Sequence, residues 1–168
     1  MNIRIRLLLF ILVWIISVSA YAEEKTKDSC VDLANEYEQL YKIPIGLLKA
    51  ISIVEARLHP WSLNKAGSGY YFKTKEEMED YTMKLHSQGI TNFDVGCMQI
   101  NIHFHGKNFK SLQDAINPAL NMEYAARFLK QLYDETGNWK DAVSYYHSRI
   151  NNQGAVYAFK VLKSWVNV

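Results

Sequence analysis

Hydrophobic positions recur at helical spacing along most of this chain. An apolar stripe predicts a first helix over about 29–41, with Asp28 or Ser29 as its cap. Pro44 suits the first position of a second helix over about 44–57, which ends before His59-Pro60. Each helix then has one apolar face that a globular domain buries.

Later helices are recognised by their ends. Thr74 and Glu77 form a capping box that opens a charged helix, and Gly89 stops it near residue 88. The pair Asn117-Pro118 opens a longer helix that ends at Gly137. Two more helices are expected, a short one capped by Asn138 and a last one over about 153–166.

Two stretches lack a helical pattern. Residues 61–69 are predicted to be loop, residues 70–72 are a strand candidate, and residues 91–101 are interrupted by glycine and expected to be non-helical. The chain is therefore predicted to be mainly α (α+β), with one small β-hairpin. Residues 23–168 fit one domain around one core.

The first 22 residues have the pattern of an export signal. Arg4 and Arg6 precede an apolar stretch that closes on Ala20-Tyr21-Ala22. This pattern predicts a secretory signal peptide over residues 1–22, cleaved after Ala22. The apolar stretch is short for a membrane span of about 20 residues, and an uncleaved signal anchor is the alternative. We expect an exported, periplasmic protein.

The charge balance disfavours a polyanionic partner. Lys and Arg number 19 and Asp and Glu 17 in the whole chain. Arg4 and Arg6 account for the difference, so residues 23–168 are formally neutral. No basic stripe points to nucleic acid, and an uncharged or mixed substrate fits better.

Cys30 and Cys97 are the only cysteines of the chain. In an exported protein an even cysteine count predicts a disulfide, and Cys30 lies on the apolar face of the first predicted helix. The alternative is two unpaired, buried thiols.

Glu55 occupies a position that a helix would bury. At about 100° per residue it falls nearly in line with Leu48 and between Ile51 and Ser52. Burial raises the pKa of a carboxyl group, and a Glu that stays protonated near neutral pH can act as a general acid. The alternative is a half-exposed Glu at the end of the helix, paired with Arg57.

Three separated segments carry a family resemblance. Glu55 stands on its helix, the run Gly-Cys-Met-Gln-Ile-Asn follows at 96–101, and Tyr146-His147-Ser148 comes later. In this order the chain resembles the lytic transglycosylase (SLT-type) family of peptidoglycan-cleaving enzymes. It looks most like small exported members that accompany type IV secretion, conjugation and pilus systems. The resemblance implies a lysozyme-like helical fold around a sugar-binding cleft, no cofactor and no metal, and we expect a monomer.

The resemblance assigns roles to residues. It implies that Glu55 is the catalytic acid, which protonates the leaving oxygen and then deprotonates the muramyl 6-hydroxyl to give a 1,6-anhydro product. It implies that Met98 and Gln99 line the cleft, that Asn101 binds sugar or N-acetyl groups, and that Tyr146 orients Glu55. His147 stands where many members have Asn, and Ala56 where the family usually has Ser.

Several alternatives stay open at this point. Met98 could fill the core, and Gln99 and Asn101 could only satisfy loop backbone. Asp94 is the nearest second carboxylate, and across the cleft from Glu55 it would make a hydrolase. Its more usual role is to cap the turn before Gly96.

Two other classes compete with a transglycosylase. Ala56 raises the alternative of a non-catalytic peptidoglycan-binding scaffold. A metal hydrolase would have to use histidines that lack the H-E-x-x-H spacing, namely His59, His103, His105 and His147.

Overall fold

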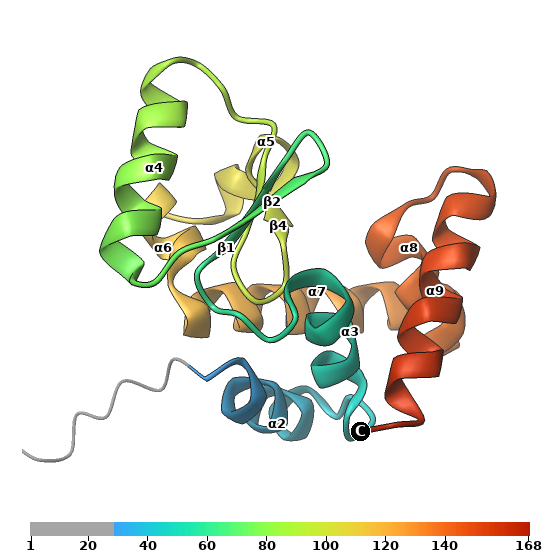
Figure 1. Cartoon of the computed structure of the whole chain (residues 1–168). Helices are drawn as coiled ribbons and strands as arrows, with labels where there is room; N and C mark the ends of the chain where they lie inside the picture. Colours follow the sequence, from blue (N-terminus) through green and yellow to red (C-terminus); the bar gives the residue numbers. More distant parts are fainter. Residues whose placement is uncertain (1–28) are drawn as a thin grey trace, which may run out of the picture.

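The computed structural model describes residues 29–168, so the predicted signal peptide over 1–22 lies outside the described residues. The described part is mainly α-helical with one small antiparallel sheet, as predicted (Figure 1). Its elements in chain order are α2 (Cys30–Tyr41), α3 (Leu47–Ala56), β1 (Ser62–Lys65), β2 (Ser68–Tyr71), α4 (Lys75–Ser87), β3 (Asp94–Val95), β4 (Ile100–Asn101), α5 (Ile102–His105), the 3-10 turn η1 (Gly106–Asn108), α6 (Leu112–Ile116), α7 (Pro118–Thr136), α8 (Trp139–His147) and α9 (Asn151–Trp165).

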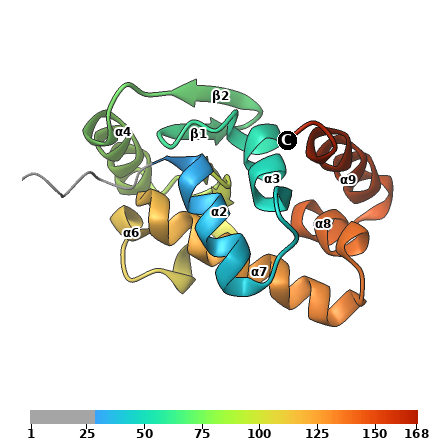
Figure 2. The ribbon, with the colours of Figure 1, turned by 90° about the horizontal axis from the view of Figure 1, so that it is seen from below.

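The buried apolar side chains form two clusters, not the single core expected from the sequence. The helical core joins α2, α3, α7, α8 and α9 to the segment around Cys97 and Met98. The sheet core lies between the sheet, α4 and α6, and contains Leu63, Met78 and Phe93. Figure 2 shows α7 running from α6 toward α8, so this helix links the two halves. The segment 93–102 contributes side chains to both clusters.

The cap residues act as predicted at most helices. The side chains of Ser29, Thr74, Asn117 and Asn138 accept hydrogen bonds from backbone N–H groups in the first turns of α2, α4, α7 and α8. The predicted start of the second helix at Pro44 is wrong. The Pro44 carbonyl accepts from Leu47 N in a separate turn, and Gly46 adopts a φ of 83° just before the helix begins.

A buried carboxylate caps α3 from a distance. The Glu38 side chain is 1% exposed and accepts hydrogen bonds from Gly46 N (2.7 Å), Leu48 N (2.8 Å) and Lys49 N (3.2 Å). The first N–H groups of a helix have no partner within it, and a negative charge there also matches the helix dipole. Glu38 therefore fixes the start of the helix that carries Glu55.

We expect Glu38→Gln to lower the free energy of unfolding by about 2 kcal/mol, because one of two acceptor oxygens and the charge are lost. Asp80→Asn is a matched control at an exposed position on α4. Urea unfolding of both variants measures the difference. Equal midpoints for Glu38→Gln and the control would contradict the capping role.

The prediction of loop over 61–69 is wrong, because β1 and β2 form a hairpin there. Leu63 pairs with Tyr70, and Ala66 and Gly67 take up the turn with φ values of 51° and 81°. Positive φ at both central residues is typical of the tight hairpin turn that matches strand twist. The sheet order is β2-β1-β3-β4, which places the 94–101 segment beside β1. The short helices α5 and α6 were not predicted. Within 29–168 no helix is long and apolar enough to cross a membrane.

Candidate active site

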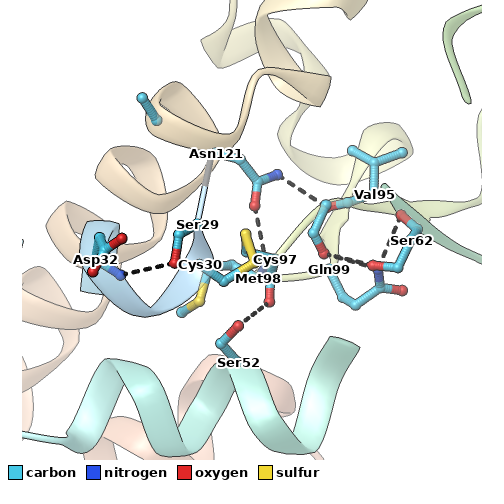
Figure 3. Close-up of a disulfide and its surroundings, with 12 residues drawn as sticks. Ser29, Cys30, Asp32, Ser52, Ser62, Val95, Cys97, Met98, Gln99 and Asn121 are labelled. Atoms are coloured by element: carbon cyan, nitrogen blue, oxygen red, sulfur yellow. Dashed lines mark hydrogen bonds between the residues drawn. A yellow bond between two sulfur atoms is a disulfide. The ribbon is translucent and has the colours of Figure 1, made fainter. Parts of the chain in front are cut away.

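A disulfide fixes the segment 96–101 to the helical half, as predicted. Cys30 and Cys97 are bonded, with Cα atoms 5.8 Å apart, and both side chains are buried. The Ser52 hydroxyl donates to the Cys97 carbonyl at 3.0 Å, which joins the same segment to α3 (Figure 3). Glu55 stands one helical turn after Ser52, so these bonds set the distance between the Glu and the segment.

Asn121 holds the same segment from the α7 side. Its side chain is fully buried, accepts from Met98 N at 3.0 Å and donates to Val95 O and Ala115 O at 2.9 Å each (Figure 3). Gly96 has a φ of 78°, and a Cβ there would come within 2.7 Å of the Asn121 amide. Glycine is required here because the backbone is left-handed and the asparagine leaves no room. In the sequence, Asn121 is recognisable as a polar residue on the apolar stripe of the helix predicted over 117–137.

The Gln99 side chain is held by hydrogen bonds from its amide nitrogen, and it lines a cavity. Nε2 donates to Ser62 Oγ (2.9 Å) and to Gly96 O (3.0 Å). Within the described residues Oε1 has no partner, and the side chain lines the cavity that contains Glu55. Gln99 itself has a φ of 46°, which is uncommon for a residue with a side chain. The predicted placement of Gln99 in the cleft agrees with this geometry.

Met98 does not line the cavity. Its side chain is fully buried in the helical core, so the core-filling alternative describes its position. Its backbone serves the site instead: the carbonyl accepts from the Tyr146 hydroxyl at 3.0 Å.

Glu55 lies at the end of α3, with its side chain largely withdrawn from solvent. Burial, with a smaller contribution from the negative charge of Asp94, raises the pKa of its carboxyl group to about 7. The neighbouring Tyr157 hydroxyl acts in the opposite direction. Glu55 is therefore partly protonated at neutral pH, and it does not form an ion pair with Arg57 within the described residues. Ala56 is fully buried, so a side chain at this position faces the core and not the cavity.

Two tyrosines, Tyr146 and Tyr157, lie near Glu55, and the negative charge of Glu55 raises the pKa of both hydroxyl groups. The Tyr146 hydroxyl donates to the Met98 carbonyl, so its proton is not directed at Glu55. Tyr157 is 5% exposed, and its hydroxyl lies close enough to Glu55 to favour the charged carboxylate. That hydroxyl makes no hydrogen bond of normal distance and angle to any described residue. The sequence signal was present, because Tyr157 precedes Val161 by four residues on the buried face of α9.

A cavity of about 300 Å³ opens beside Glu55 between the sheet and the helical half. Its walls combine carboxyl and amide groups with aromatic rings, a mixture that suits sugars. The lining residues are Glu55, Asn64, Asp94, Gln99, Ile100, Asn101, Phe104, His105, Phe128, Tyr146 and His147. The structure thus brings together the predicted residues Glu55, Gln99, Asn101, Tyr146 and His147, and of the predicted set it leaves out Met98.

Asp94 belongs to the cavity, and its predicted role as a turn cap is wrong. It lies in β3, paired with Asn64 of β1 and Asn101 of β4. Asn101 Nδ2 donates to Asp94 Oδ1 at 2.8 Å and to Asn92 Oδ1 at 3.1 Å. Burial raises the pKa of Asp94, although the Asn101 bond opposes this. The Asn101 amide nitrogen is thus engaged within the protein, and its oxygen accepts from Phe104 N.

His147 ends α8 and lies flat on Tyr157, with ring centroids 4.4 Å apart and an angle of 8° between the planes. Burial and the charge of Lys160 lower the pKa of His147, while Asp94 raises it. His147 is therefore a largely neutral hydrogen-bonding group at the edge of the cavity.

The histidines named in the metal alternative lie in different surroundings. His59 contacts the Tyr71 ring, His103 bonds Thr91, and His105 bonds the Tyr124 hydroxyl at 2.8 Å. In the part of the chain that the structure describes, no three His, Cys, Asp or Glu side chains gather as metal ligands.

Comparison with known proteins gives one match. The family model described as Transglycosylase SLT domain matches residues 32–158. The matched stretch contains Glu55, the segment 96–101 and Tyr157. No curated protein and no solved structure matches the chain.

Proposed function

Because this chain belongs to the transglycosylase SLT family, whose substrate is peptidoglycan, we propose that it is a lytic transglycosylase that uses Glu55 as its acid and base. The observation that carries the proposal is the position of Glu55: a half-buried carboxyl group with a pKa of about 7, in a cavity walled by amides and aromatic rings. A general acid works best when its pKa lies near the working pH.

The proposed reaction cleaves the β-1,4 bond between MurNAc and GlcNAc. Protonated Glu55 gives its proton to the leaving glycosidic oxygen, and the 2-acetamido carbonyl of the substrate supports the oxocarbenium-like centre. The Glu55 carboxylate then takes the proton of the muramyl 6-hydroxyl, whose oxygen bonds C1. The product is a 1,6-anhydromuramyl end, Glu55 is protonated again, and no water is consumed. Gln99 Oε1 and His147 line the cavity where they would bind the sugar.

The rate should depend on pH through Glu55. The protonated form starts the reaction, so kcat/KM should be level below about pH 7 and fall roughly tenfold per unit above it. In Asp94→Asn the falling limb should move to lower pH, because the charge that raises the pKa of Glu55 is gone. A pH profile of glycan cleavage measures both. A wild-type rate that stays level to about pH 9 would contradict the assignment of Glu55 as the acid.

The position of Asp94 favours a second candidate, a hydrolase of the same fold. Asp94 and Glu55 line one cavity, and a second carboxylate is what an inverting hydrolase needs to activate water. The Asn101 amide already donates to one oxygen of Asp94, so this carboxylate is less available to activate water than a free one. We therefore place the transglycosylase first.

Product analysis separates the two candidates. Purified sacculi are digested in water labelled with ¹⁸O, and the products are examined by mass spectrometry. A transglycosylase gives unlabelled anhydromuramyl ends, and Asp94→Asn should keep appreciable activity with the same products. Label on the muramyl C1, together with an inactive Asp94→Asn, would establish the hydrolase. Binding of sacculi without any cleavage would establish the scaffold.

The proposed site of action is the periplasm, reached through the predicted signal peptide. There the enzyme would open the wall locally for an envelope-spanning machine such as a type IV secretion, conjugation or pilus system. The family match supports peptidoglycan as the substrate, and the machine remains part of the proposal.

A further inference from the structure

A second cavity, of about 490 Å³, also has Glu55 in its wall. It lies between the end of α3, the end of α8 and the first turns of α9. Glu55 and His147 line both cavities, so a substrate at Glu55 borders on this space as well. Figure 1 shows α8 and α9 packed side by side.

The walls of the second cavity are rich in hydrogen-bond donors. Asn152 and Gln153 contribute amide groups, and Lys160 contributes an ammonium group. The Tyr157 hydroxyl is buried and has no partner of normal geometry among the described residues. A buried polar group without a partner is costly unless a ligand or water satisfies it. Because the Tyr157 hydroxyl acts on Glu55, the groups left for a ligand in this cavity are the exposed amides of Asn152 and Gln153 and the ammonium group of Lys160.

Lys160 is the only cation among the lining residues, and it forms no ion pair with any described residue. The nearby arginine, Arg149, is occupied by Glu135, with two nitrogen–oxygen distances of 2.6 Å. Glu55 is the one carboxyl group among the residues that line this cavity, and Asp94 lies in the other cavity. Lys160 therefore presents an ammonium group without an ion-pair partner to a space where a substrate carboxylate could bind.

We propose that this second cavity binds a carboxylate of the substrate through Lys160, with the amide groups of Asn152 and Gln153 as further donors. The proposal rests on the proposed function, because it concerns the substrate of the same site. Glycan hydroxyl and acetamido groups are uncharged, whereas the stem peptides on the muramyl residues carry carboxylates. The ligand class is therefore a stem-bearing glycan strand, and Lys160 is a specificity residue and not a catalytic one.

Removing the negative charge of the substrate's carboxylates tests this proposal. One batch of sacculi is amidated with carbodiimide and ammonia, which converts stem carboxylates to amides, and a second batch is left untreated. The wild-type protein, Lys160→Gln and the control Lys163→Gln are compared on both. Lys163 lies further along α9 and does not line the cavity.

We expect amidation to lower the kcat/KM of the wild type by roughly threefold to tenfold. Loss of an exposed ion pair corresponds to the lower value, and loss of a hydrogen bond to a charged group corresponds to the upper value. Lys160→Gln should show the same loss on untreated sacculi and no further loss on amidated ones. Lys163→Gln should behave as the wild type. A wild type that cleaves both batches equally well would overturn the carboxylate site and leave the enzymatic function intact. A wild type that cleaves neither would instead overturn the proposed function.

A third batch tests whether the stem supplies the carboxylate. An amidase hydrolyses the amide between the lactyl group and the stem peptide, which removes the stem and creates a lactyl carboxylate that untreated stem-bearing residues lack. If the effect of Lys160→Gln disappears on stripped glycan, the stem carboxylate is the ligand. If it persists, the new lactyl carboxylate replaces the stem carboxylate, and amidation of the stripped glycan should remove the effect. An effect that survives this amidation would overturn the carboxylate site.

Discussion

Replacing Glu55 by Gln should lower glycan cleavage by roughly 10²–10⁴-fold, because general acid–base catalysis contributes that much and Gln cannot transfer a proton. The loss should be larger still if both proton transfers fail. Release of soluble fragments from sacculi measures the rate, and circular dichroism checks that the fold is unchanged. Asp80→Asn, an exposed change on α4, is the matched control. Cleavage by Glu55→Gln at a rate near that of the wild type would exclude Glu55 as the catalytic acid.

The same variant should be more stable than the wild type at neutral and higher pH. The pKa of Glu55 is about 7 in the folded protein and 4.5 as the ordinary value. Between these values the folded protein holds a proton that the unfolded chain has lost, so folding stability falls as pH rises through this window. Above about pH 7 the charged Glu55 carboxylate lowers the stability of the folded protein by on the order of 3 kcal/mol, and the Glu55→Gln variant does not carry this charge. Near pH 4 the two proteins should unfold at similar denaturant concentrations, which gives an internal control.

The second large effect concerns the disulfide. Removing it with the double change Cys30→Ala and Cys97→Ala should lower the free energy of unfolding by about 4 kcal/mol, because the bond joins residues with a sequence separation of 67 and so closes a long loop. The melting temperature should fall by roughly 10 °C. Activity should fall as well, since Cys97 adjoins the Met98 and Gln99 backbone that positions the site.

Thermal unfolding with and without a reductant checks this prediction on the wild type. The reduced wild type and the double variant should melt at the same temperature. Two free thiols per molecule in the unfolded, unreduced protein would contradict the bond.

Local sequence rules predicted the longer helices and singled out Glu55, but they did not find the more deeply buried glutamate, Glu38. Glu55 was singled out because it shares a face with Leu48 and Ile51, and the structure leaves it half-buried. Glu38 follows Ala34 by four residues on the flank of another apolar stripe and is buried. The difference lies in their partners, since Glu38 meets three backbone N–H groups and Glu55 meets none. Such partners come from contacts that helical spacing does not specify.

The errors at the site have the same origin. The position of Tyr146 after the resemblance motif suggested a bond to Glu55, but the packing of α8 against the segment at Met98 directs the hydroxyl to a carbonyl. Tyr157 reaches Glu55 only because α9 packs against α3. Asp94 was read as a turn residue because a glycine follows it closely, and its strand partners lie 30 residues before and 7 residues after it in the chain. Pairing over such separations is decided by tertiary structure.

The most direct test of the central claim is the titration of the Glu55 carboxyl group itself. Carbon-13 NMR of glutamate-labelled protein, with Glu55→Gln to assign the signal, follows the side-chain carboxyl carbon as pH changes. A midpoint near pH 7 is predicted, because burial holds the proton on Glu55. A midpoint near the ordinary value of 4.5 would mean that Glu55 is charged at neutral pH and does not serve as the acid.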